Sequence, residues 1–169
     1  MSEWILPAAL RALVPVSLVE RWAYAPLSVT VELTSRCSLR CRYCYQDSGP
    51  ERADVLTDPI GLLRALRKLD VHTVELTGGE PTLHPQFREA LDFALAEFPV
   101  VGLITNGLHL APDIVSALAQ GRARVIVQVS LAGPDEEYVD AVVGVPGAFR
   151  RIVDGIRRIK AAGIRLRVG

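Results

Sequence analysis

The three cysteines of this 169-residue chain lie within eight positions, in the stretch RCSLRCRYC at residues 36–44. Cys37, Cys41 and Cys44 are spaced C-x3-C-x2-C. Thiolates are soft ligands that suit zinc and iron–sulfur clusters, and three thiols cannot all pair within one chain. Structural zinc normally takes four protein ligands, and the histidines of the chain lie far away in the sequence. The cysteines therefore predict a reactive metal centre with one open coordination position.

Three arginines, Arg36, Arg40 and Arg42, alternate with the cysteines. Their positive charge would offset the negative charge of thiolates and so tune the reduction potential of a bound cluster. The alternative is that each is a solvated surface side chain.

Short apolar runs typical of strands alternate with segments of helical periodicity. The predicted strands are residues 27–33, 73–77, 100–105, 123–131 and 164–168, and the predicted helices are residues 58–69, 85–98, 112–121 and 146–163. This alternation predicts a parallel sheet joined by right-handed crossovers, either doubly wound or barrel-like. The cysteines directly follow the first strand, at the carboxyl edge where parallel α/β folds place their ligand sites.

Polar residues recur at every second position of the predicted strands, whereas strands buried on both faces would be almost continuously apolar. They are Thr30, Glu32, Thr34, Thr73, Glu75, Thr77, Gln128, Ser130, Arg165 and Arg167. This pattern favours an α/β fold that forms a partial (β/α) barrel, an incomplete TIM-like parallel sheet of about five βα units with a polar lumen. An ordinary sheet with one partly solvated face is the alternative. Residues 1–26 are expected to form an N-terminal helical extension.

The segment CSLRCRYC resembles the CxxxCxxC signature of the radical S-adenosylmethionine (radical SAM) superfamily, including the aromatic Tyr43 before the last cysteine. Three further segments follow successive predicted strands in the order of that superfamily's core, a partial α/β barrel: LTGGEP at 76–81, TNG at 105–107 and VSLAG at 129–133. The resemblance covers about residues 27–169, which we take as an incomplete radical SAM core domain.

The resemblance implies that Cys37, Cys41 and Cys44 bind three irons of a [4Fe–4S] cluster, and that S-adenosylmethionine (SAM) chelates the fourth iron. It implies an enzyme in which an electron from the cluster cleaves SAM to methionine and a 5′-deoxyadenosyl radical, which abstracts hydrogen from a peptide or small-molecule substrate. An electron donor for the cluster is then an expected partner. Neither the substrate nor a catalytic residue is identified by any motif.

The GGEP turn is the second predicted part of the site. Gly78 and Gly79 permit close backbone approach to a ligand, Glu80 could accept hydrogen bonds from the methionine ammonium of SAM, and Pro81 rigidifies the turn. A plain strand-to-helix turn with a solvated Glu80 is the alternative.

The resemblance places three further residues at the cofactor. Tyr43 would lie beside the adenine, or else pack under the cysteine loop; Ser130 would contact SAM; and Asn106 would belong either to the site or to an ordinary Asn-Gly turn. His84 and His109 also follow strand ends, where a single loop histidine is more often incidental.

The chain departs from the family pattern in two respects. Many relatives carry an arginine that helps to hold the SAM carboxylate where this chain has Val142, and Ala132 stands where many have aspartate. The family core usually has six strands, and five are predicted here. The alternative function is therefore a truncated or degenerate Fe–S/SAM-binding module without full catalytic activity. An exposed sheet edge would favour low stability or oligomers.

The charge balance and the apolar runs of the sequence argue against nucleic acid and membrane as partners. The 19 basic and 19 acidic residues give a formal net charge of zero, which argues against a nucleic-acid binder held by bulk electrostatics. No apolar run approaches the ~18–20 residues that span a bilayer, and prolines interrupt the apolar N-terminal stretch, which lacks the basic start of a signal peptide. We expect a cytoplasmic protein.

Overall fold

A computed structural model describes residues 26–169 of the chain. The N-terminal helical extension predicted for residues 1–26 lies outside the described residues except for its last position. None of the helices described is long and apolar enough to cross a membrane.

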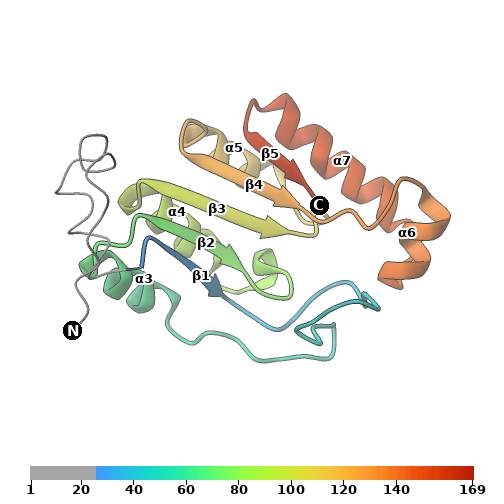
Figure 1. Ribbon diagram of the computed structural model, residues 1–169, viewed down its shortest axis with the longest axis horizontal. Helices are drawn as coiled ribbons and strands as arrows, with labels where there is room; N and C mark the ends of the chain where they lie inside the picture. Colours follow the sequence, from blue (N-terminus) through green and yellow to red (C-terminus); the bar gives the residue numbers. More distant parts are fainter. Residues whose placement is uncertain (1–25) are drawn as a thin grey trace, which may run out of the picture.

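Five parallel strands form one sheet, in the order β1-β2-β3-β4-β5 (Figure 1). They are β1 (Ser28–Glu32), β2 (Thr73–Thr77), β3 (Val100–Thr105), β4 (Val125–Val129) and β5 (Arg165–Val168). Each strand pairs with the next in the sequence, for example Val31 with Leu76 and Leu103 with Val127. The predicted strands and their parallel α/β arrangement are therefore confirmed.

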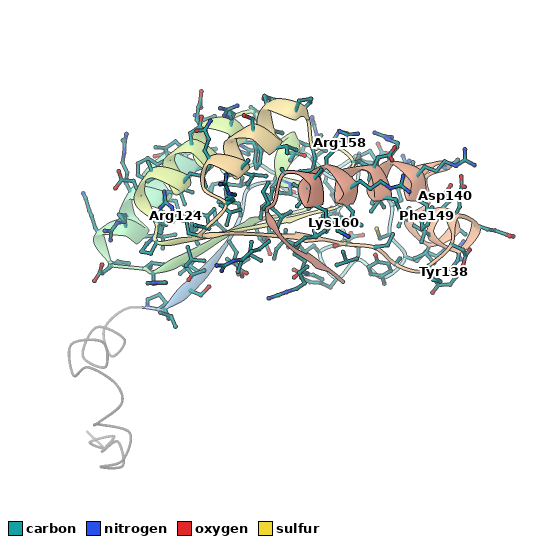
Figure 2. The ribbon with its side chains drawn as sticks, turned by 90° about the horizontal axis from the view of Figure 1, so that it is seen from above. Arg124, Tyr138, Asp140, Phe149, Arg158 and Lys160 are labelled. Carbon is teal, nitrogen blue, oxygen red and sulfur yellow. The ribbon has the colours of Figure 1, made fainter. Side chains whose placement is uncertain are left out.

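The helices are α3 (Pro59–Lys68), α4 (Phe87–Glu97), α5 (Pro112–Gln120), α6 (Glu136–Val143) and α7 (Ala148–Ala161), with a short 3-10 helix η1 (Pro81–Leu83). Figure 2 shows α3, α4, α5 and α7 over one face of the sheet. In the part of the chain that the structure describes, no helix covers the other face. This one-sided arrangement is that of a barrel wall, with the helices outside.

The two faces of the sheet differ as the alternating pattern predicts. Val31, Leu76 and Leu103 point toward the helices and are buried. The opposite face carries exposed or half-buried polar side chains, and hydrogen bonds cross between strands there: Thr30 Oγ1 donates to Glu75 Oε2 (3.2 Å), and Arg167 Nη1 donates to Gln128 Oε1 (3.2 Å). Two of the predicted polar positions, Thr34 and Thr77, are buried instead: the Thr34 hydroxyl donates to the Asp54 carbonyl (2.9 Å), and Thr77 lies at the carboxyl end of β2.

Helix boundaries follow from local chemistry. Asp58 caps α3 by accepting a hydrogen bond from the Gly61 N–H (2.7 Å), and Pro59 occupies the first turn, as predicted. The structure begins α4 at Phe87, slightly later than predicted, because Pro85 and Gln86 form a turn between η1 and the helix.

Helix α6 was not predicted. Its signals are present in the sequence: Asp135 accepts from the Tyr138 N–H (2.9 Å) as N-cap, and Gly144 ends the helix in the left-handed conformation (φ 70°). At eight residues it is too short for a periodic pattern to stand out.

Candidate functional site

The cysteine loop lies at the carboxyl end of β1, beside α6 (Figure 1). Its backbone is tied down at both sides. The Cys37 N–H donates to the Gly49 carbonyl (3.1 Å), and the N–H groups of Arg40 and Arg42 donate to the carbonyls of Val143 (2.9 Å) and Val142 (3.1 Å). Val142, which replaces the expected arginine, thus holds the loop through its backbone. The last carbonyls of α6 find their partners in the cysteine loop.

The three thiols are free and differ in burial. Cys37 is 7% exposed, and Cys41 and Cys44 are half-buried. The Cys37 Sγ accepts from the Leu39 N–H (3.5 Å) and the Asn106 side-chain amide (3.7 Å). Burial raises the pKa of the Cys37 thiol, and burial together with the nearby Cys37 raises the pKa of the Cys41 thiol. Both groups are therefore held as thiols until a metal displaces their protons.

Three thiols can serve as ligands of a zinc ion or of an iron–sulfur cluster. Across residues 26–169, no three His, Cys, Asp or Glu side chains are arranged to hold one metal ion. The ligands of a zinc ion must converge on a single point, whereas three thiolates that bind separate irons of a cluster need not. Thiolates are the donors that bind the irons of such a cluster, so the three cysteines fit one.

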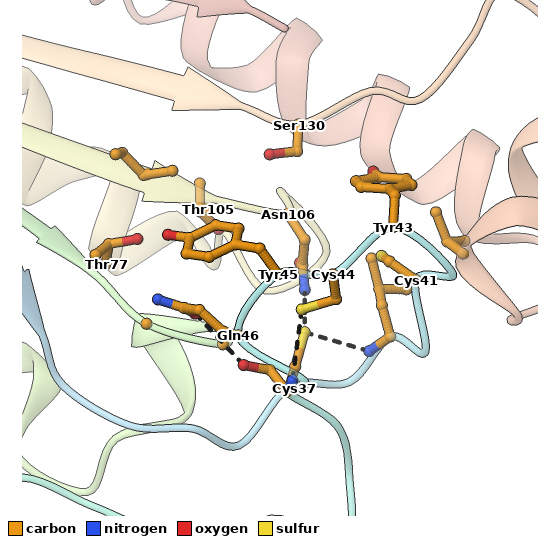
Figure 3. A pocket seen from close by; sticks show the side chains of 16 residues that line it. Cys37, Cys41, Tyr43, Cys44, Tyr45, Gln46, Thr77, Thr105, Asn106 and Ser130 are labelled. Atoms are coloured by element: carbon orange, nitrogen blue, oxygen red, sulfur yellow. Dashed lines mark hydrogen bonds between the residues drawn. The ribbon is translucent and has the colours of Figure 1, made fainter.

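One pocket brings eight of the ten predicted site residues together (Figure 3). These are Cys37, Cys41, Cys44, Tyr43, Gly78, Gly79, Asn106 and Ser130. The pocket holds about 740 Å³ of free space, part of it open to solvent. Among the described residues, no lysine or arginine lines it. Glu80 and Pro81 are outside its wall.

Glu80 lies beneath the pocket, fully buried. The Thr105 hydroxyl lies 2.9 Å from both of its carboxyl oxygens, and the Asn106 N–H donates to Oε2 (2.8 Å). The N–H and hydroxyl of Thr82 donate to Oε1 (3.2 and 2.5 Å). The alternative of a solvated Glu80 is therefore wrong. Its predicted hydrogen bond from the SAM ammonium stays a prediction, and the structure shows in addition that it joins the ends of β2 and β3.

The two glycines of the GGEP turn pack against the start of the cysteine loop. Gly78 has a φ of +141°, and a Cβ there would collide with the Thr34 carbonyl oxygen. A Cβ on Gly79 would lie 2.5 Å from the Arg36 carbonyl oxygen. The Gly79 N–H donates to the Thr34 carbonyl (2.7 Å). Only glycine allows these two backbones to approach so closely.

Two tyrosines flank Cys44 at the pocket. Tyr43 is 57% exposed, and partial burial together with the neighbouring Cys41 raises the pKa of Tyr43 to about 12. Tyr45 is 89% exposed and also lines the pocket, and the adjacent Gln46 donates to Glu32 Oε1 (2.5 Å). Sequence reading missed Tyr45 and Gln46, because no motif marks them.

The two loop histidines have different surroundings. His84 is buried between the Leu56 carbonyl (2.9 Å from Nε2) and the Gln86 N–H, so it fastens a turn. His109 reaches the cysteine loop, with Nε2 3.0 Å from Ser38 Oγ. The flanking arginines are exposed, and Arg40 pairs with Glu51 (2.8 Å).

Comparison with known proteins gives a family match over nearly all of the described chain. A sequence model described as the radical SAM superfamily matches residues 31–168.

Curated relatives include the antilisterial bacteriocin subtilosin biosynthesis protein AlbA of Bacillus subtilis (strain 168), 34% identical over 145 residues, covering 85% of this chain and 32% of that protein. The mycofactocin maturase MftC of Mycobacterium tuberculosis (strain H37Rv) is 36% identical over 146 residues, covering 85% and 37%. The GTP 3′,8-cyclase of Synechococcus sp. (strain CC9902) is 34% identical over 152 residues, covering 82% and 44%. The chain spans less than half the length of these relatives.

Solved structures share the fold. Streptococcus suis SuiB bound to S-adenosylmethionine superposes with a TM-score of 0.74 at 20% identity, covering 90% of this chain and 36% of that one. The structure of anSMEcpe with bound AdoMet and a peptide gives a TM-score of 0.67 at 18% identity, covering 83% and 42%.

Proposed function

This chain belongs to the radical SAM superfamily, whose SAM and [4Fe–4S] cluster are its cofactors, and on that premise we propose that it generates a 5′-deoxyadenosyl radical for hydrogen abstraction from a peptide substrate. Cys37, Cys41 and Cys44 would hold the cluster. When bound, the cluster and SAM supply the electron and the radical precursor.

A single observation carries the proposal: one pocket at the carboxyl edge of the sheet joins the thiol loop, the GGEP turn and the ends of β3 and β4. Residues from four separate parts of the sequence meet there, through Cys37, Gly79, Asn106 and Ser130. Three thiols leave one iron of a four-iron cluster without a protein ligand, so the pocket beside them is where SAM would bind.

The residues of the chain prepare this site in distinct ways. The thiols of Cys37 and Cys41, whose pKa values are raised by burial, would give up their protons on cluster assembly. Binding to iron would compensate for the cost of deprotonating them. The backbone of Gly78 and Gly79 would form the wall next to SAM, and the Tyr43 ring would cover the adenine. Ser130 offers a hydroxyl at the opposite wall.

A peptide is the favoured substrate class. The names of two curated relatives refer to a bacteriocin and to mycofactocin maturation, and two structural neighbours contain a bound precursor peptide and a bound peptide. The polar face of the sheet carries both signs of charge, with Glu75 on β2 near one edge and Arg165 on β5 at the other. Hydrogen-bonding groups of both kinds suit an extended peptide.

Anaerobic reconstitution tests the function. We expect about four irons and four sulfides per chain, with broad visible absorption, and 5′-deoxyadenosine when SAM and dithionite are added. Cys41→Ala should lose the absorption and the product, whereas Thr30→Ala, on the sheet face outside the pocket, should retain both. Stoichiometric zinc without iron in the wild type would refute the proposal.

A second candidate is a module that binds cluster and SAM without full activity. It is favoured by the lining of the pocket, which over residues 26–169 offers no lysine or arginine to the SAM carboxylate. A loaded wild-type chain that binds SAM and forms no 5′-deoxyadenosine would select this candidate.

A further inference from the structure

A hydrogen-bond network reaches the most buried cysteine from the end of β3. The side-chain amide of Asn106, Nδ2, lies 3.7 Å from Cys37 Sγ and 3.3 Å from Ser38 Oγ. His109 Nε2 lies 3.0 Å from the same Ser38 Oγ. Asn106 is 6% exposed, whereas Ser38 and His109 are half-buried, and Figure 3 shows the amide pointing at the Cys37 sulfur.

The orientation of the Asn106 amide is fixed by its other partners. Its Oδ1 accepts from the Leu108 N–H (3.0 Å), and its backbone N–H donates to the buried Glu80 (2.8 Å). Because the amide nitrogen is a donor and cannot accept a hydrogen bond from the Leu108 N–H, Oδ1 must face Leu108 and the NH2 group must face the cysteine loop. Both N–H groups of the amide are then committed, one to Cys37 and one to Ser38.

A donor at this position has an electronic consequence. Reduction adds a negative charge to an iron–sulfur cluster, and part of that charge resides on its thiolate ligands. A hydrogen bond to a charged acceptor is stronger than one to a neutral acceptor. The Asn106 amide therefore stabilises the reduced state more than the oxidised state, as hydrogen bonds to cluster sulfurs do.

We propose that Asn106 is a positioning residue of the cluster site, which orients Cys37 and raises the reduction potential of the bound cluster through its side-chain amide. The inference rests on the proposed function, because it requires a cluster at the three cysteines. The hydrogen bond from Asn106 to the Cys37 sulfur is a role separate from any contact of Asn106 with SAM.

The first test measures the reduction potential of the cluster in the reconstituted chain. Electron paramagnetic resonance monitors the reduced cluster during a redox titration. Asn106→Ala should load iron like the wild type and have a more negative midpoint. We expect the equilibrium between the two states to change by up to about tenfold, which is about 59 mV for a one-electron couple. Ser38→Ala, which removes the other acceptor of the same amide, should leave the midpoint close to that of the wild type.

The second test needs no variant. Asn106 is the only asparagine of the chain, so asparagine labelled with 15N in its side-chain amide marks this one group. In the reduced wild-type protein, electron spin echo spectroscopy should detect a weak 15N coupling to the cluster. The same coupling should persist in Ser38→Ala.

The outcomes separate the inference from the function on which it rests. A loaded wild type that cleaves SAM but has no 15N coupling would overturn the inference alone, as would an unchanged midpoint in loaded Asn106→Ala. A wild type that takes up no iron would overturn the proposed function and the inference together. If Asn106→Ala takes up no iron while the wild type does, the 15N coupling in the wild type tests the inference: its presence supports the hydrogen bond to the cluster, and its absence overturns it.

Discussion

Glu80 combines complete burial with four hydrogen-bond donors aimed at one carboxyl group. Buried polar groups cost little while they are paired and much when a partner is removed. The donors from Thr105 and Asn106 lie at the carboxyl end of β3, which Thr105 closes and Asn106 follows, and those from Thr82 belong to η1. Loss of this carboxyl group would therefore release two strand ends at the site.

Glu80→Ala should lower the free energy of unfolding by about 2–3 kcal/mol, because it strands buried donors. Urea denaturation measures the loss. Glu75→Ala removes a glutamate that accepts only the Thr30 hydroxyl among the hydrogen bonds described, and it should cost less than about 0.5 kcal/mol. Equal effects of the two substitutions would contradict the role given to Glu80.

Alkaline pH should destabilise the cluster-free chain through its buried thiols. Burial raises the pKa values of Cys37 and Cys41 above 9.0, so the folded state keeps protons that the unfolded state releases. Their contribution to stability is complete below pH 9 and is lost as pH rises through the raised values. Tyr43 adds a similar loss between pH 10.0 and about 12.

The melting temperature of the cluster-free chain, measured between pH 8 and pH 11, checks this. The decline should be smaller in a variant with Cys37→Ser and Cys41→Ser, because serine does not ionise in this range. A decline identical to that of the wild type would show that the thiols do not carry the effect.

The turn between β2 and η1 has a backbone that only glycine fits at Gly78. Gly78→Ala should cost about 1–3 kcal/mol from backbone strain, and the collision with Thr34 adds to it. Because that collision displaces the start of the cysteine loop, iron uptake should fall as well. Urea denaturation and iron content after reconstitution measure the two effects.

Gly163 supplies the control for Gly78. It too has a positive φ (+68°), but nothing lies within 4 Å of a Cβ placed there. Gly163→Ala should cost about 1–2 kcal/mol and leave iron uptake unchanged. Iron loss in both variants would mean that backbone strain anywhere in the chain, rather than the contact with Thr34, impairs the site.

Helix α6 stabilises the cysteine loop through the carbonyls of Val142 and Val143. Removing its N-cap by Asp135→Ala should cost about 1 kcal/mol, as should Asp58→Ala at the N-cap of α3. Only Asp135→Ala should speed hydrogen exchange at the Arg40 N–H, because only α6 contacts the loop there. Equal acceleration in both variants would argue against a specific role of α6.

For the molecule as a whole, the periodic parts could be read from the sequence. Five strands and the four longest of the described helices alternate clearly, and the alternation of polar and apolar residues predicted the uncovered face. The motif segments were predicted to lie at strand ends, and parallel strands bring such ends to one edge. Eight predicted site residues therefore meet in one pocket.

The features of the site that could not be predicted depend on the three-dimensional path of the chain, which the periodicity of the sequence does not encode. Asn106 and Cys37 are 69 positions apart, and nothing local links an amide to a thiol at that separation. Tyr45 enters the pocket because the loop bends back after Cys44. The burial of Glu80 follows from donors on β3, whereas its charge alone favours the surface.

The anchoring of the cysteine loop on α6 also bears on the order of events during synthesis. The hydrogen bond from the Arg40 N–H to the Val143 carbonyl cannot form until Val143 has been synthesised. At ~5–20 residues per second, the intervening hundred or so residues take roughly 5–20 s to translate. Throughout that interval the thiols of the nascent chain lack the backbone frame that arranges them. Cluster insertion is therefore expected to follow completion of α6, and an oxidant acting earlier would meet cysteines that the fold has not yet enclosed.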